Sequence, residues 1–199
     1  MSKHTEATHA TSQTACAIGS SQNNHESTLI HGHYSAVCRD AAGVQLWRDD
    51  FDNLVTTAGK NLILDSALSG NAYTASFFLG LISAVSYTAV SEADTMASHA
   101  GWLEAGLANA PAYSEATRRA AAWAAATAGR KSLSAGLTFT FTSGGTVKGS
   151  FLSTVATKDG TTGTLYSAGL FTGGDQIVAA TNTLTVSYTA SLNPSVVSI

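Results

Sequence analysis

The chain has 199 residues, of which 44% are hydrophobic and only 12% are charged, and its formal net charge is −3 at pH 7. That length suits one domain with a sizeable core. The basic residues are few and scattered, which excludes the dense positive surface of a nucleic-acid-binding protein. No apolar run approaches the roughly 18 residues of a membrane span, so neither nucleic acid nor a membrane is an expected partner. A surface this poor in charge favours a homo-oligomer.

The N-terminal segment 1–28 is polar and rich in Ser, Thr, Gln, Asn and His. Because it offers almost nothing large to bury, it predicts an arm that is either disordered or ordered only against a neighbouring subunit. It also lacks the apolar core of a signal peptide, so synthesis in the cytoplasm is expected. The only cysteines, Cys16 and Cys38, form no CxxC pair and no disulfide framework, which indicates reduced thiols. Residues 29–199 form the single predicted domain.

Two strands are predicted after the arm, joined by a turn at 40–43 with Asp early and Gly late. Apolar residues alternate along them, at Tyr34, Ala36 and Cys38 and then at Val44 and Leu46.

A helix is predicted over about 57–69, the only one indicated with clear end signals. Thr56 or Thr57 is its expected N-cap, and Gly70 stands where a left-handed C-terminal residue is usual.

The middle of the chain predicts one buried strand and two less regular segments. Residues 72–83, "AYTASFFLGLIS", are apolar and aromatic throughout, which is typical of a strand buried on both faces. Residues 89–106 predict a loop, with room for one helical turn near 93–99. Residues 114–132 fit either a helix, because Ala favours it, or a strand around Trp123.

The C-terminal half predicts further strands. Leu137, Phe139 and Phe141 alternate with threonines, and a turn at 143–146 then predicts a return strand, so that the two form a hairpin. Further strands are predicted within 162–175 and 182–192, the second half-buried. Eight or nine strands with one helix indicate an all-β, mainly antiparallel sandwich, with a jelly roll as the favoured form.

Sequence patterns for catalysis are absent or incomplete. "SLSAG" has Ser where a nucleophile elbow needs its first Gly, and "TTAGKN" places Asn61 after Lys60, where a phosphate-binding loop needs a hydroxyl. His31 and His33 share one strand face, but a metal needs further ligands, for which His25 and Asp40 are the nearest candidates. An exposed polar face is the favoured interpretation of these histidines.

Two other groups of side chains leave alternatives open. Asp49, Asp50 and Asp52 could bind Ca²⁺ or act as catalytic carboxylates, although their spacing favours an ordinary strand end and turn. The three tryptophans could line a carbohydrate groove, although core or interface positions are favoured for them; they are Trp47, Trp102 and Trp123. We therefore assign no catalytic, cofactor-binding or metal residue, and we expect a protein that is not an enzyme.

Several segments resemble a group of tailed-phage virion proteins. They are "DNLVTTAGKNLILDSALSGNAYTASFFLGLIS" (52–83), "DTMASHAGW" (94–102), "YSEATR" (113–118) and "TKDGTTGTLYSAGLFTGG" (157–174). Together they extend over most of 52–190, and their order is more distinctive than any one of them. The group is similar to accessory capsid components, including cement or decoration proteins with jelly-roll folds.

The resemblance implies a cement protein on the virion surface, whose partners are the major capsid protein and further copies of itself, with a trimer favoured over a dimer. A cement protein needs a stable β body and a self-associating surface but no active site. The alternative is a head or tail fibre module that binds a host receptor or glycan, with Trp102, Trp123 and the tyrosines as stacking groups.

Overall fold

The computed structural model describes residues 25–68 and 76–197. In these residues the chain forms one helix, α1 (Thr57–Leu68), and eleven strands whose named pairs are all antiparallel, so the predicted all-β class with one short helix is confirmed. The strands are β1 (His25–Arg39), β2 (Gln45–Val55), β3 (Phe78–Ser83), β4 (Leu103–Ala105), β5 (Arg119–Ala120), β6 (Arg130–Ser132), β7 (Leu137–Thr140), β8 (Gly145–Ser153), β9 (Leu165–Leu170), β10 (Gln176–Val178) and β11 (Thr183–Val197).

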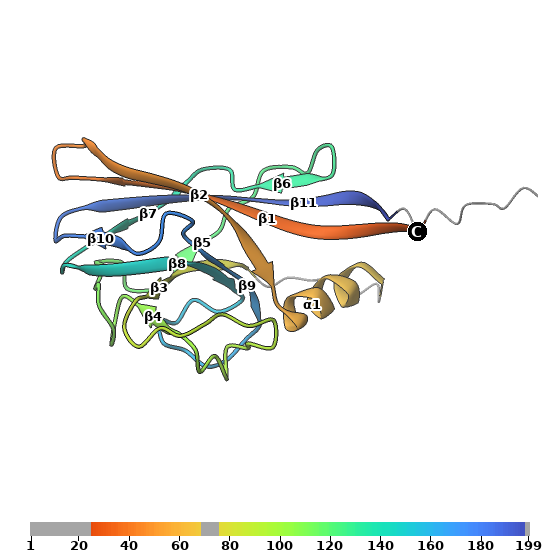
Figure 1. Ribbon diagram of the computed structural model, residues 1–199, viewed down its shortest axis with the longest axis horizontal. Helices are drawn as coiled ribbons and strands as arrows, with labels where there is room; N and C mark the ends of the chain where they lie inside the picture. Colours follow the sequence, from red (N-terminus) through yellow and green to blue (C-terminus); the bar gives the residue numbers. More distant parts are fainter. Residues whose placement is uncertain (1–24, 69–75, 198–199) are drawn as a thin grey trace, which may run out of the picture.

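The strands form two sheets that share β2 (Figure 1). The first sheet has the order β2–β1–β11, and both β6 and β7 pair with the other side of β11. The second has the order β2–β9–β8–β3–β4, with β10 paired to β8 and β5 paired to β3. β2 belongs to both because it pairs with β1 as far as Asp52 and with β9 from Asn53 onward. The two sheets pack as a sandwich; its jelly-roll form stays a prediction.

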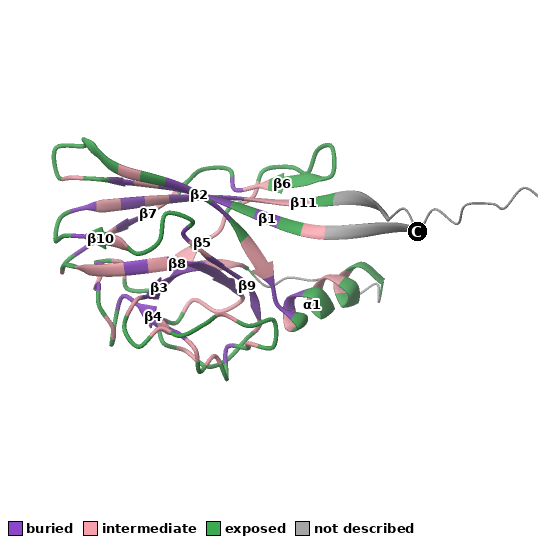
Figure 2. Cartoon of the chain, viewed as in Figure 1, coloured by how far each residue is buried: buried purple, intermediate pink, exposed green. Residues whose placement is uncertain are grey.

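The main core lies between the two sheets (Figure 2). The strands β1 and β11 each send alternate side chains into it, as the sequence predicts: Tyr34, Ala36, Cys38, Leu184, Val186 and Tyr188. The ring of Tyr34 stacks on Phe51 of β2 with centroids 5.0 Å apart and lies 4.6 Å from Tyr188. Burial raises the pKa of the Cys38 thiol to about 11, so this cysteine is a packing residue rather than a reactive one.

The β1–β2 hairpin forms as predicted. Its turn is held by Asp40, whose carboxylate accepts the backbone N–H groups of Ala42 at 2.9 Å and Val44 at 2.8 Å. Gly43 follows with φ of +83°, a left-handed conformation that glycine adopts without strain.

Val44 and Leu46, where the sequence continues the alternation of apolar residues, do not face the core. They are 59% and 50% exposed. A bulge is the reason: Arg39 pairs with Gln45, but Cys38 pairs with Trp47, so β2 carries one extra residue. An extra residue reverses the faces of a strand, and the odd-numbered residues of β2 face the core instead.

The helix α1 begins where the sequence predicts and ends within one residue of the predicted boundary. Thr56 is the N-cap, since its Oγ1 accepts the Gly59 N–H at 3.0 Å and donates to the carbonyl of Leu165 at 2.5 Å. Gly59 is the buried residue of the helix. A Cβ there would lie 2.2 Å from the carbonyl oxygen of Tyr166, so only glycine lets α1 approach β9 this closely. The predicted cap at Gly70 lies outside the described residues.

The strand predicted over 72–83 is observed as β3, which begins at Phe78, and residues 72–75 lie outside the described part of the chain. Burial on both faces is confirmed. Leu79 and Leu81 enter the main core, whereas Ile82 enters a second cluster on the opposite face of the second sheet, which a loop covers.

The two ambiguous segments of the middle region are irregular rather than helical. The predicted loop at 89–106 contains turns and β4, and no helical turn forms near 93–99. The segment 114–132 contains β5, β6 and an isolated bridge from Trp123 to Leu133, so its helical alternative is wrong. Alanine propensity is a weak preference that tertiary packing overrides.

The predicted hairpin around the turn at 143–146 is wrong, although both of its strands exist. β7 pairs with β11 in the first sheet, whereas β8 pairs with β3, β9 and β10 in the second. The chain therefore crosses between the sheets at this turn. Phe139 of β7 and Val147 of β8 enter the same core from opposite sides, so the alternation of apolar residues does not distinguish this crossing from a hairpin.

The boundary of the predicted arm differs from the structure. β1 begins at His25, and residues 25–28 pair with β11, so the paired strand begins before residue 29. Residues 1–24 lie outside the described residues. No helix in the described part of the chain is long and apolar enough to cross a membrane.

Candidate binding groove

The acidic residues of β2 do not gather into one site. Asp49 is 5% exposed and binds the loop after β9, accepting the Thr172 hydroxyl at 2.5 Å and the Gly173 N–H at 2.8 Å. Asp50 and Asp52 point to the opposite, exposed face. Asp49 therefore ties the two sheets together, and the predicted structural interpretation of this run fits the contacts that it makes.

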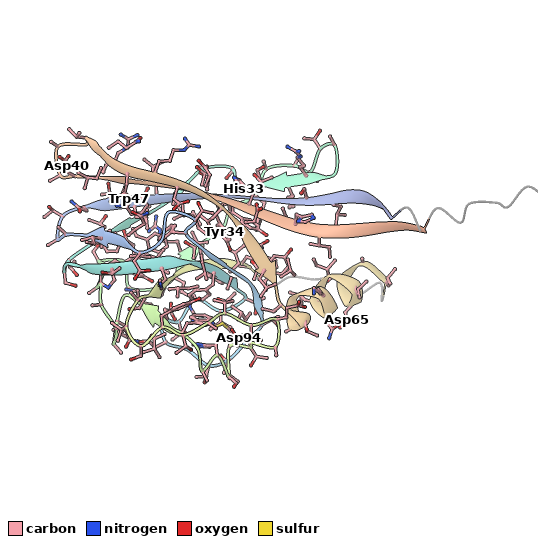
Figure 3. All side chains as sticks on the ribbon, in the orientation of Figure 1. His33, Tyr34, Asp40, Trp47, Asp65 and Asp94 are labelled. Atoms are coloured by element: carbon pink, nitrogen blue, oxygen red, sulfur yellow. The ribbon has the colours of Figure 1, made fainter. Side chains whose placement is uncertain are left out.

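The exposed face of β1 and β2 carries a small charged cluster. His33 lies on the other side of β1 from Tyr34 (Figure 3), with its Nδ1 2.9 Å from Asp52 and its Nε2 3.9 Å from Asp50. Arg48 donates to both oxygens of Asp50, at 2.8 and 3.0 Å, and holds the pKa of that carboxyl below its usual value. Within the described residues, no group of three or more His, Cys, Asp or Glu side chains could hold a metal ion.

The remaining sequence candidates have structural roles. Lys60, in the incomplete phosphate-loop pattern, binds Glu92 at 2.8 Å. Trp102 is fully buried in the second cluster, where its Nε1 donates to Asp94 at 3.0 Å. Trp47 is half-buried and donates to the carbonyl of Ile177 at 3.2 Å. Of the three tryptophans, only Trp123 borders an open cavity.

That cavity is an apolar groove of about 630 Å³, a volume within the usual range of small-ligand pockets. One wall is aromatic: the ring of Phe77 lies 6.0 Å from Trp123 and 5.4 Å from Tyr166, centroid to centroid. The lining residues are Ile30, Ile63, Ser76, Phe77, Ala121, Trp123, Ala126, Gly129, Arg130, Lys131, Tyr166, Tyr188, Ala190, Ser191 and Leu192. Its walls suit apolar or aromatic groups, with two cationic residues among the lining.

The groove exists because the first sheet is longer than the second. β1 and β11 pair from His25–Val197 to Arg39–Thr183, and their outer halves extend past the body as a ribbon, whose Ala190 and Ser191 also pair with β6 (Figure 1). We call residues 25–32 and 190–197 the ribbon. Its inner face continues the alternation of the core, which places Ile30 and Leu192 opposite α1 rather than opposite the second sheet.

The helix α1 covers the groove incompletely. Only Ile63 of the helix lines it, whereas Leu64 and Leu68 are 53% and 80% exposed. Along its length α1 is largely exposed (Figure 2). Among residues 25–68 and 76–197, a core-like surface is therefore left partly open between the ribbon and the helix.

The sequence does not predict the groove. The period-two signal that places Tyr188 in the core extends to Ala190 and Leu192, and the same signal on β1 extends back to Ile30. That continuation shows which face these residues share. It does not show that the opposing sheet ends before them.

A buried ion pair is contacted by two of the sequence segments quoted above, "YSEATR" and "TKDG". Arg118, the last residue of "YSEATR", is 1% exposed and binds Glu104 through two bonds of 2.9 and 2.7 Å. It also donates to the Ser153 hydroxyl at 3.1 Å and to the carbonyl of Val155 at 2.9 Å. A bidentate arginine with further acceptors is a fully satisfied buried charge, so the segment stabilises the fold.

The "TKDG" segment meets the same ion pair. The backbone N–H of Asp159 donates to Glu104 at 2.7 Å. Lys158 donates to the carbonyls of Gly106 at 2.9 Å and Tyr113 at 3.2 Å, and its pKa is lowered by burial. These residues join loops of the second sheet, and none of them lines the groove.

A comparison with protein-family models finds no match, and a comparison with curated protein sequences finds none either.

Proposed function

We propose that the chain is a structural protein of a tailed-phage virion, a cement protein that binds the shell of the major capsid protein and bridges neighbouring capsomers. Its place is the capsid surface, and it is made in the host cytoplasm. It acts as a homo-oligomer, with a trimer favoured over a dimer, and not as an enzyme.

The ribbon is the observation that carries this proposal. Beyond the pairing of β6 with Ala190 and Ser191, the ribbon has two strands among the described residues, and two paired strands are at best marginally stable in water by themselves. An open strand edge is a surface that pairs with other chains. Here β1 and β11 extend beyond the sheets that bury their inner halves. An element of this kind costs stability in an isolated subunit and is useful in an assembly.

The contacts of the polar side chains also support a structural role. Each aspartate considered for acid–base chemistry has a polar partner within the protein. Asp49 binds Thr172, Asp50 binds Arg48, and Asp52 contacts His33. Strengthening of a shell then comes from several modest contacts per oligomer, which add through avidity.

Binding to empty shells tests the proposal. Shells from particles that lack this protein should take up the purified chain to saturation in a co-sedimentation assay. A chain that starts at His25 should keep its folded body, because β1 begins there, but should bind the shells more weakly. Absence of binding by the intact chain would rule out the cement role.

A fibre module that binds a host glycan is the second candidate. Trp123 supports it, because this side chain is half-buried and lines the groove beside Tyr166 and Tyr188. Trp102 cannot contribute as a stacking group, because it is fully buried. Binding to a glycan array that is lost in Trp123→Ala, without binding to shells, would favour this candidate.

A further inference from the structure

The charged residues that line the groove are cationic. Among the described residues the lining includes Arg130 and Lys131 but no Asp or Glu. Within the described part of the chain, neither cation forms an ion pair with a carboxylate. Lys131 donates instead to the backbone carbonyl of Ala124, at 3.1 Å. A cation whose partner is neutral still attracts an anion, so the charge of the groove is complementary to that of a negatively charged ligand.

Lys131 lies on the groove side of the first sheet. It pairs with Ala190 of β11, and residues that are directly paired on neighbouring strands share one face of a sheet. Ala190 itself lines the groove. Because Lys131 is exposed, its ammonium group lies at the solvent edge of the groove and not in the apolar interior.

The wall formed by β11 is long enough for an extended chain. Tyr188, Ala190 and Leu192 stand at alternate positions along it, which is roughly 13 Å of strand at about 3.3 Å per residue. Tyr188 is the deep end, since it is 1% exposed and its hydroxyl accepts a hydrogen bond from the Asn53 amide at 3.0 Å. Leu192 is the outer end, since it is 51% exposed. The wall therefore leads from solvent into the body of the protein.

The other walls are apolar and come from separate elements. Ile30 belongs to β1, Ile63 to α1, and Phe77 directly precedes β3. Methylene groups that leave water for such walls gain free energy in proportion to the area that they bury. A charge placed among them without a partner is costly. A ligand that fits the groove therefore has an apolar body and carries its charge at the solvent edge.

We propose that the groove binds a fatty acid, whose alkyl chain packs against the apolar walls and whose carboxylate lies at the solvent edge beside Lys131. The cavity of about 630 Å³ is within the usual range for a ligand of this size. Burial of the chain supplies the affinity, and the cation selects a carboxylate over a neutral end group. This binding does not depend on the capsid role proposed above.

Isothermal titration calorimetry of the full-length chain with decanoate and with 1-decanol tests the role of the charge. The two probes share one alkyl chain and differ in the charge of the end group. Lys131→Gln should weaken decanoate binding about threefold to tenfold, the loss expected for one exposed charge-assisted contact, and leave 1-decanol binding unchanged. Arg39→Gln is the control, because Arg39 is exposed at the turn end of β1 and does not line the groove.

A second pair of variants tests where decanoate binds. Leu192→Asp places a carboxylate at the outer end of the groove, where it removes apolar surface and repels the ligand, so the affinity for decanoate should fall by about tenfold or more. Leu46→Asp is the matched control, because Leu46 is 50% exposed, nearly as much as Leu192, and does not line the groove. It should change the affinity by less than about twofold. Circular dichroism of both variants checks that their folds are intact.

Saturable binding of one decanoate per chain, with both expected losses, supports the proposal. Absence of decanoate binding by the intact chain would overturn it. So would equal effects of Lys131→Gln on the two probes, or equal effects of Leu192→Asp and Leu46→Asp. If the intact chain binds no decanoate and Leu192→Asp dissociates its oligomer in analytical ultracentrifugation, the groove is a contact between subunits instead. None of these results bears on the binding of the chain to empty shells, which the co-sedimentation assay measures separately.

Discussion

Arg118 joins several loops of the second sheet through its buried hydrogen bonds. Its side chain is 0% exposed and that of Glu104 is 2% exposed, with the two joined at 2.7 Å. Removal of one partner of a buried ion pair is far more costly than loss of the pair's own attraction, because a charge is left without compensation.

Arg118→Ala should therefore lower the free energy of unfolding by about 3–5 kcal/mol. Its neighbour Arg119 is the matched control: its side chain is 38% exposed and its contact with Glu115 is 4.0 Å, so Arg119→Ala should cost less than about 1 kcal/mol. Urea denaturation of the two variants measures both values. Similar losses for both would contradict the role given to Arg118.

Buried tyrosines make the fold sensitive to alkali. Burial raises the pKa of Tyr34, Tyr113, Tyr166 and Tyr188 above the ordinary value of 10.0. A group whose pKa is raised on folding stabilises the native state fully below the unfolded pKa and loses that contribution as the pH rises toward the folded pKa. The free energy of unfolding should stay constant up to about pH 9. Above pH 10 it should fall by about 1.4 kcal/mol per pH unit for each of these tyrosines.

Absorbance at 295 nm and far-ultraviolet circular dichroism, followed together from pH 8 to pH 12, measure this effect. Ionisation of these tyrosines should coincide with the loss of strand signal. If all the tyrosines ionise near pH 10 while the fold stays intact, the buried positions assigned to them are wrong.

At the scale of elements, α1 depends on one glycine. Alanine favours a helix over glycine by about 1 kcal/mol, but a Cβ at residue 59 would lie 2.2 Å from the carbonyl oxygen of Tyr166. Because backbone cannot give way as a side chain can, Gly59→Ala should destabilise the protein despite its better helix propensity. Ser66→Ala, at a half-buried position of the same helix, is the control, because it raises helix propensity and removes only a hydrogen bond to the Leu62 carbonyl within the helix.

Hydrogen exchange of the backbone amides shows which elements the Gly59→Ala substitution destabilises. Gly59→Ala should increase exchange in α1 and at the β9 residues it contacts, and leave β1 and β11 unchanged. Unchanged protection of α1 would show that the helix does not need this close approach.

Local pattern predicts most of the strands, but not their partners. The alternation in β11 and the Asp40–Gly43 turn are set by neighbouring residues, so both are predictable from the sequence. The pairing of β7 with β11 rather than β8 is decided by packing across the core, to which both strands contribute apolar side chains. The bulge before Trp47 has no local signal, and it sets which face of β2 meets the core.

The candidate site is less predictable than the fold. Trp123 is an expected contact residue that the structure places on the groove. The open half of that groove results from the different lengths of two sheets, and sheet length follows from long-range pairing that a single sequence does not display. Arg118 stands in a recognisable segment, yet nothing near it in sequence identifies Glu104 as its partner.

At the scale of the whole molecule, a stable sandwich carries an extension that its own core does not bury. The body has two clusters of buried apolar residues and a satisfied ion pair, whereas the ribbon extends past both sheets beside an apolar groove. With only 12% charged residues, the surface has little to oppose association. These features together favour a protein that works by contact, in many copies.

Cryo-electron microscopy of purified phage particles tests this claim most directly, because one map gives the location, copy number and oligomeric state of the chain. The proposal predicts density for the β-sandwich on the outside of the head, in numbers comparable with the major capsid protein, grouped as trimers with ribbons that reach adjacent capsomers. A few copies confined to the tail, or none in the particle, would contradict it.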